Sequence, residues 1–198
     1  MDIEFEENTD EDFNDEFDSD TDNSSTQMSD MIGKTVSDIF NEGYEFSGHS
    51  SIDNDYSFYV TSYEAPSDIL DIIQQLEGLT VKDLLDKDLN IGYMIMMDQC
   101  ILTAQIGSSQ ISFEVEGAAE IINSYKDEDP FTDIEDMPEL YDLPVTNVTF
   151  DHIKYTMVLD EDFITLAASD DFTLDSPEEQ LKDFTVTDFY CEPIPDIF

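Results

Sequence analysis

The strongest constraint on this chain is its charge. It contains 50 Asp and Glu residues against six Lys and no Arg, which gives a formal net charge of −44 over 198 residues. Carboxylates in such excess repel one another, so they must lie on the surface, where water and salt screen them. Because 40% of the residues are hydrophobic and 12% are aromatic, the chain can still bury a core. We therefore expect a folded domain with a strongly acidic surface.

The same imbalance excludes several functions. A nucleic-acid-binding surface needs an array of Lys and Arg to neutralise phosphates, and direct binding of nucleic acid or of an anionic membrane surface is therefore not expected. The sequence also shows no hydrophobic leader and no run of 18 apolar residues, so we expect neither a signal peptide nor a membrane span within it. The basic residues are Lys34, Lys82, Lys87, Lys126, Lys154 and Lys182.

Composition divides the chain near residue 30. Residues 1–30 hold 13 acidic residues and no basic one, a composition that cannot bury enough apolar surface to offset the entropy of ordering. We predict a disordered acidic tail over 1–30, whose scattered aromatic residues either dock on a partner or merely interrupt a solubilising segment. Residues 31–198 carry the other 37 acids and all six lysines, a net charge of 6 − 37 = −31, and form the predicted acidic domain.

Hydrophobic periodicity within 31–198 predicts an α+β fold. Helical spacing predicts helices at 67–76 and 118–125. A Gly-Ser-Ser turn at 107–109 joins two alternating runs as a hairpin. Residues 127–144 read as an acidic, Pro-containing loop. The order of the elements favours a mostly antiparallel sheet with a few short helices. Strands are predicted at 56–61, 93–97, 100–106, 110–115, 145–150, 155–159 and 163–167, and alternation favours a further strand at 184–189.

One phrase occurs twice, 45 residues apart. Residues 33–40 read Gly-Lys-Thr-Val-Ser-Asp-Ile-Phe, and residues 78–85 read Gly-Leu-Thr-Val-Lys-Asp-Leu-Leu. In the first, Thr35 is placed to accept a hydrogen bond from the Asp38 amide and so begin a helix. The repeat is consistent with two related halves, 31–76 and 77–198. Chance recurrence of a common helix start is the competing interpretation.

The known motifs of catalysis and metal binding are missing. No segment meets every requirement of a calcium loop, and loops starting at Asp10 and Asp18 lack both the glycine and the final glutamate. No phosphate-binding glycine loop occurs. Ser50, His152 and Asp151 could supply a nucleophile, a base and an orienting acid, but no local motif supports that set. Cys100 and Cys191 fit neither a zinc spacing nor a disulfide framework. We expect no enzyme activity, no catalytic residue, no metal and no cofactor.

The acidity itself is the feature that points to a function. A rigid acidic surface can occupy the Lys and Arg array with which a protein grips DNA. The composition resembles that of phage-encoded DNA mimics and of immunity proteins against basic toxins, in charge alone. We therefore expect an inhibitor of a nuclease, a restriction or CRISPR effector, or another DNA-binding protein, acting in the cytoplasm of the cell that contains it. The candidate partner-binding residues are Asp127, Glu128, Asp129, Asp133, Glu135, Asp136, Glu139, Asp160, Glu161, Asp162, Asp170 and Asp171.

A second interpretation places the protein outside the cell. A tail rich in Ser, Thr and Asp could tether a small α+β domain to a bacterial surface, as in a lipoprotein. That interpretation requires a leader or a lipid-carrying cysteine before Met1, which this sequence does not contain. The two interpretations differ in the partner they require, because only the inhibitor needs a basic protein.

Overall fold

The fold is known from a computed structural model that describes residues 28–52, 55–87, 89–96, 99–168, 173–195 and 197. These residues form a seven-stranded antiparallel sheet accompanied by short helices. The α+β prediction with a mostly antiparallel sheet is therefore confirmed. The predicted disordered tail lies outside the described residues except for its last three positions.

The strands follow the order β1-β2-β6-β5-β4-β3, and β7 pairs with β6 on the edge opposite β2. Every pairing is antiparallel. A short turn joins β4 to β5. Strands β1 and β3 lie at the two ends of this order. The bounds are β1 Glu45–Ile52, β2 Asp55–Ser62, β3 Ile91–Met96, β4 Gln99–Ile106, β5 Ser109–Val115, β6 Val145–Leu159 and β7 Val186–Tyr190.

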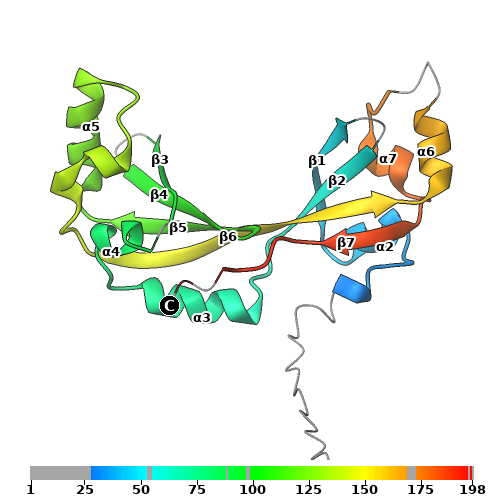
Figure 1. The fold of residues 1–198 in the computed structure, drawn as a ribbon, viewed down its shortest axis with the longest axis horizontal. Helices are drawn as coiled ribbons and strands as arrows, with labels where there is room; N and C mark the ends of the chain where they lie inside the picture. Colours follow the sequence, from blue (N-terminus) through cyan, green and yellow to red (C-terminus); the bar gives the residue numbers. More distant parts are fainter. Residues whose placement is uncertain are drawn as a thin grey trace, which may run out of the picture.

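Strand β6 is the spine of the molecule. Its 15 residues pair first with β5 and then with β2 and β7. As a result two wings extend from a narrow centre (Figure 1), one built on β3, β4 and β5 and the other on β1, β2 and β7. The helices are α2 Val36–Asn41, α3 Ser67–Leu76, α4 Val81–Leu85, α5 Ala118–Glu128, α6 Glu161–Ala167 and α7 Pro177–Leu181, with 3₁₀ turns η1 Ile134–Asp136 and η2 Pro138–Leu140.

Each wing has its own hydrophobic core. One cluster contains Leu102, Ile111 and Phe113 from the sheet, packed against residues of α3, α4, α5, η1 and η2. The other contains Phe58 and Met157 from the sheet, packed against residues of α2, α6 and α7. We name the first the β5 lobe and the second the β2 lobe. The chain therefore buries two small cores, with β6 contributing residues to both.

The helix starts predicted from the repeated phrase are confirmed. The Asp38 amide donates to Thr35 Oγ1 at 3.2 Å and the Asp83 amide donates to Thr80 Oγ1 at 3.1 Å. Each aspartate carboxylate in turn accepts from the backbone amide of its threonine. Both helices thus begin with a reciprocal capping box, which satisfies two otherwise unpaired amides.

One strand prediction is wrong. Residues 163–167 form part of helix α6 instead of a strand. Asp160 begins this helix by accepting the Phe163 amide at 3.3 Å, and Phe163 and Ala167 are buried at helical spacing. The alternation of Phe163, Thr165 and Ala167 resembled a strand because a four-residue separation satisfies both periods. In addition, the strands predicted at 145–150 and 155–159 are one continuous strand, β6.

The C-terminal segment after β7 crosses from the β2 lobe to the β5 lobe (Figure 1). The Ser108 amide donates to the Glu192 carbonyl at 3.3 Å, and the Glu192 amide donates to Ser108 Oγ at 2.8 Å. Further along, Lys87 Nζ donates to the Ile197 carbonyl at 3.1 Å. The side chain of Ile197 packs against the β5-lobe core. This segment therefore ties the two lobes together in addition to β6.

Candidate functional site

The acidic residues between α5 and β6 are displayed on an ordered segment. Here Ile134, Met137 and Leu140 are buried at intervals of three residues, at 2% exposure or less. Glu135, Asp136 and Glu139 lie between them, so the same spacing that buries the apolar side chains directs these three acids outward. Two 3₁₀ turns, with three residues per turn, produce this arrangement. The exposed acids within residues 127–139 are Asp127, Asp129, Asp133, Glu135, Asp136 and Glu139.

Hydrogen bonds fix the beginning of this segment. The Asp129 carboxylate accepts the Phe131 amide at 3.0 Å, and Thr132 Oγ1 donates to the Asp129 carbonyl at 2.9 Å. The hydroxyl of Tyr93, on β3, donates to the Thr132 carbonyl at 3.2 Å. The loop is therefore bonded both to itself and to the edge of the sheet. Glu128, in the last turn of α5, completes the segment.

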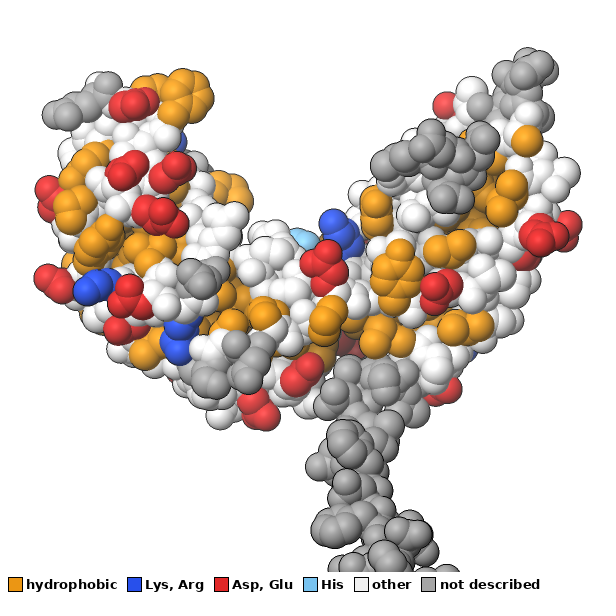
Figure 2. Space-filling view, viewed as in Figure 1, with side chains coloured by type: hydrophobic (Ala, Val, Ile, Leu, Met, Phe, Trp, Pro, Cys, Tyr) orange, Lys and Arg blue, Asp and Glu red, His pale blue; other side chains and the backbone are white. Residues whose placement is uncertain are grey.

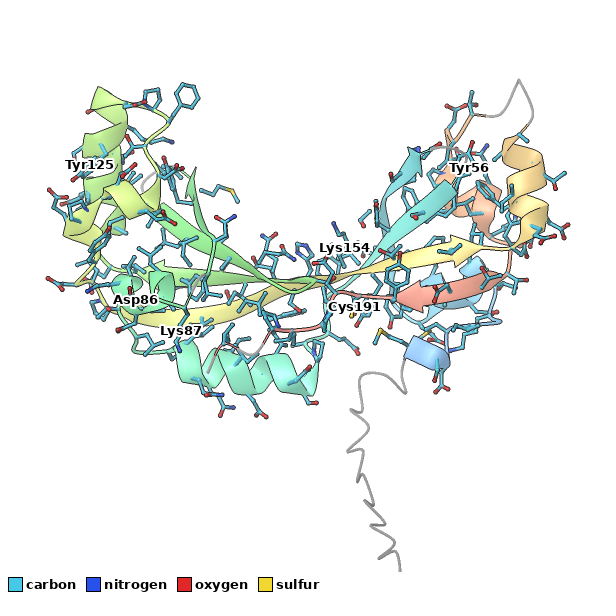
Figure 3. All side chains as sticks on the ribbon, viewed as in Figure 1. Tyr56, Asp86, Lys87, Tyr125, Lys154 and Cys191 are labelled. Carbon is cyan, nitrogen blue, oxygen red and sulfur yellow. The ribbon has the colours of Figure 1, made fainter. Side chains whose placement is uncertain are left out.

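Two tyrosines fix its end. The Tyr141 hydroxyl donates to the backbone carbonyl of Glu135, and the Tyr125 hydroxyl donates to the Glu139 carboxylate. The bond from Tyr125 stabilises the charged form of Glu139 and lowers its pKa below the ordinary value. Tyr125 is labelled on the left wing in Figure 3. Glu139 thus stays ionised at neutral pH and is held in one place.

We name residues 127–139 the acidic tip. Lys126 precedes the tip in the chain, and its ammonium group contacts an aromatic ring of the same lobe. Its Nζ lies 5.0 Å from the centre of the Tyr93 ring. Elsewhere, Lys34 pairs with Glu42 at 2.5 Å and Lys182 pairs with Glu179 at 3.2 Å. Six lysines cannot neutralise 50 acids in any arrangement. The surface of the tip is therefore strongly negative.

The second group of predicted partner-binding residues lies on the other wing. Asp160, Glu161 and Asp162 stand at the start of α6, on the β2 lobe. Figure 1 shows α6 and α5 on opposite wings, and Figure 2 shows acidic side chains on both wings with a hollow between them. The structure therefore brings the residues of the acidic tip together but keeps them apart from the α6 group. Asp170 and Asp171 lie outside the described residues.

Within the α6 group, Asp160 has a structural role. Its carboxylate accepts the Thr185 amide at 2.9 Å and the Phe163 amide at 3.3 Å. Burial alone would raise the pKa of Asp160, but these hydrogen bonds outweigh burial and the pKa is lowered. Asp160 therefore joins α6 to the residues before β7. Glu161 and Asp162 are exposed in the first helical turn, where negative charge favours the helix.

Sequence reasoning missed an aromatic residue on the acidic tip. Phe131 is 87% exposed, more than any other large hydrophobic side chain described. Its neighbours Asp129, Pro130 and Thr132 are turn-forming residues, and an apolar residue between turn formers is a signal that could have marked it. An isolated exposed aromatic contributes nothing to a core, whereas aromatic side chains are enriched among the residues that anchor interfaces.

The set of Ser50, His152 and Asp151 is not assembled. Ser50 pairs with Ser57 on β2, whereas His152 pairs with Gln110 on β5. Extending the β2–β6 register places Ser50 level with residue 158 of β6, six residues or about 20 Å along the strand from His152. Asp151 instead accepts hydrogen bonds from Ser112 Oγ at 2.6 Å and Gln110 Nε2 at 3.3 Å. These three residues cannot act together on one substrate.

The remaining nucleophiles and metal ligands are separated as well. Cys100 lies on β4 and Cys191 follows β7, both as free thiols, and burial raises the pKa of each. Among the residues that the structure describes, no three His, Cys, Asp or Glu side chains gather as a metal-binding group. No helix in the described ranges is long and apolar enough to cross a membrane. No protein-family model, curated protein or solved structure matches the chain.

Proposed function

We propose that this protein is a non-catalytic acidic inhibitor that binds the basic nucleic-acid-binding surface of another protein. The partner class comprises nucleases, restriction or CRISPR effectors and other DNA-binding proteins. One observation carries the proposal: the acidic tip holds its carboxylates outward on a segment anchored by buried residues and hydrogen bonds. A folded display of this kind keeps charges at fixed positions, as the phosphates of a duplex are.

Charge and shape would contribute differently to binding. Complementary charge accelerates the encounter of two proteins and makes the association rate fall as salt rises. The exposed Phe131 supplies an apolar contact that salt does not screen. The backbone that carries these carboxylates is already ordered, so it loses little conformational entropy when a partner binds. The expected complex therefore forms quickly at low salt and retains a salt-resistant component.

The test is a capture experiment with competition. The full chain is immobilised, incubated with lysate at about 0.05 M and about 0.5 M salt, and the retained proteins are identified by mass spectrometry. The retained proteins are then displaced with duplex DNA. We expect basic DNA-binding proteins whose capture is much weaker, but still measurable, at high salt. We also expect DNA to release them, because the protein and the nucleic acid would share one surface.

A matched pair of variants makes the test specific. E135Q/D136N/E139Q removes three charges from the acidic tip, and E64Q/D71N/E77Q removes three exposed charges on and beside α3. Both variants have the same net charge. We expect the first to lose the captured protein and the second to retain most of it. Equal loss from both variants, or capture of neutral and acidic proteins alone, would show that net charge or another surface is responsible.

A further inference from the structure

Each lobe contains a set of four backbone hydrogen bonds, and the two sets have the same pattern. Four bonds join the start of α2 to the residues that lead into β7: Gly33 N to Val186 O at 2.8 Å, Val186 N to Lys34 O at 2.9 Å, Val36 N to Phe184 O at 3.0 Å and Ser37 N to Lys182 O at 3.0 Å. Four bonds join the start of α4 to the residues that lead into β6: Gly78 N to Val145 O at 3.1 Å, Val145 N to Leu79 O at 2.8 Å, Val81 N to Leu143 O at 3.0 Å and Lys82 N to Tyr141 O at 3.1 Å. One set follows from the other by adding 45 on the helix side and subtracting 41 on the strand side.

The strand registers correspond too. In the β2 lobe, Phe58 pairs with Met157 and Val60 pairs with Tyr155. In the β5 lobe, the equivalent pairs are Leu102 with Phe113 and Ala104 with Ile111. The next strand in each lobe has a register shift at the same place, between Val158 and Leu159 in one and between Glu114 and Val115 in the other. A bulge at matching positions is a detailed feature that the general fold class does not require.

The sequence retains a trace of the same correspondence. Residues 129–149 and 170–190, compared without gaps, are identical at seven of 21 positions. Among the described positions, Leu140 matches Leu181 and Val145 matches Val186, and all four side chains are buried. The offset of 41 is the one that the hydrogen bonds give independently. Together with the two capping boxes, which are 45 residues apart, it relates the beginning and the end of each lobe.

We infer that the chain contains two copies of one αβββαβ module, and that the second copy is inserted into the first. The first copy consists of 33–62 and 153–190, and the second consists of 78–150. In the second copy the turn at Gly107 and Ser108 joins the second and third strands. In the first copy the same connection is opened to admit α3 and the entire second module. Hairpin turns accept insertions because few contacts are lost there.

The duplication also bears on the acidic surfaces, and for their role this inference rests on the proposed function. By the offset of 41, residues 173–180 occupy the place in the first module that residues 132–139 of the acidic tip occupy in the second. They are acidic as well, with Asp175, Glu178 and Glu179 exposed. Residues 173–180 and 132–139, on opposite wings, are therefore equivalent acidic surfaces of one repeated module. A partner that fits both carries its basic sites in duplicate, as a homodimer does.

An exchange of equivalent segments tests the duplication in the full chain. Residues 140–147 and 181–188 are swapped reciprocally except for Pro144 and Thr185, which stay in place because the Thr185 amide donates to Asp160. The exchange leaves the composition and charge unchanged and keeps Leu and Val at the buried positions. We expect cooperative thermal unfolding with a melting temperature within about 10 °C of the parent. In the control, 140–147 receives 182–189 and 181–188 receives 141–148. This one-residue offset moves apolar side chains to exposed positions, so we expect no cooperative transition.

If the reciprocal exchange fails to fold as the offset control does, the two segments are not equivalent and the inference is overturned. A second measurement needs no variant. Amide hydrogen exchange on the native chain should protect Val36 and Val186 in one lobe and Val81 and Val145 in the other. Rapid exchange at either pair would remove the matched bonds on which the inference depends. Neither readout involves a partner, so failure here is distinguishable from failure of the capture experiment.

Discussion

The C-terminal segment passes close to Gly107 of the β5 lobe. Its φ is +56°, and a Cβ built there would lie 2.5 Å from the Pro193 carbonyl oxygen and 2.8 Å from the Glu192 carbonyl oxygen. Gly117 also has a positive φ, +85°, but a Cβ there meets nothing within 4 Å. The two glycines therefore separate backbone strain from steric overlap. Substitution by alanine adds only the strain at Gly117 and adds both at Gly107.

We expect Gly117→Ala to lower the free energy of unfolding by about 1 kcal/mol, the usual penalty for an L-residue with left-handed backbone. Gly107→Ala adds an overlap with backbone atoms, which costs about 1–3 kcal/mol more. For a domain of this size each kcal/mol shifts the melting temperature by about 2–4 °C. The expected losses are thus about 2–4 °C for Gly117→Ala and about 4–16 °C for Gly107→Ala, measured by thermal unfolding under identical conditions.

A truncated chain tests whether the C-terminal segment causes the extra penalty at Gly107. If residues 191–198 are removed, the atoms that the new Cβ would meet are gone, so Gly107→Ala should then cost no more than Gly117→Ala. The truncation alone should also destabilise the chain, because Ser108 loses its two hydrogen bonds with Glu192. Equal melting temperatures for the two glycine variants in the full chain, or an unchanged penalty for Gly107→Ala after truncation, would refute the proposed contact.

Three other outcomes are expected. Hydrogen bonds from the Thr80 backbone and side chain lower the pKa of Asp83 below its ordinary 3.8, so its stabilisation is present above about pH 4 and is lost as the pH falls. Thermal unfolding of D83N should show a lower melting temperature than the parent at pH 7, and this difference should narrow as the pH falls below about 4. Raising salt from about 0.1 M to 1 M shortens the screening length from about 10 Å to 3 Å, so the melting temperature of this chain should rise, and a fall would contradict surface self-repulsion. Phe131→Ser should change stability by less than about 0.5 kcal/mol, because the ring is 87% exposed, yet weaken capture of the partner about tenfold at high salt; unchanged capture would remove Phe131 from the interface.

The elements that the sequence predicted well are those with local signals. Thr35 and Thr80 begin helices through bonds to residues three positions away, and the turn at Gly107 joins strands that are adjacent in the chain. Residues 163–167 were misassigned because the separation of Phe163 and Ala167 fits both a helix and a strand. The bond from the Thr185 amide to Asp160 that holds α6 in place joins residues far apart in the chain. No periodicity reveals a bond across 25 residues.

The candidate site shows the same division. The acids of 127–139 could be listed from the sequence, and the buried spacing of Ile134, Met137 and Leu140 that directs them outward is a local pattern. Their separation from Glu161 and Asp162 depends on the path of β6, which pairs with three other strands. One-dimensional patterns carry no information about which strands become neighbours, so the two-winged shape could not be predicted.

The length of β6 has a consequence for any molecule that touches both wings. At about 3.3 Å per residue, its 15 residues span at most about 50 Å, the length of some 15 base pairs at 3.4 Å each. Because this one strand runs unbroken through the centre, its length sets the separation of the two wings. Substitutions in the loops change the groups that each wing presents to a bound molecule, whereas lengthening or shortening this strand changes the distance between the two contact surfaces.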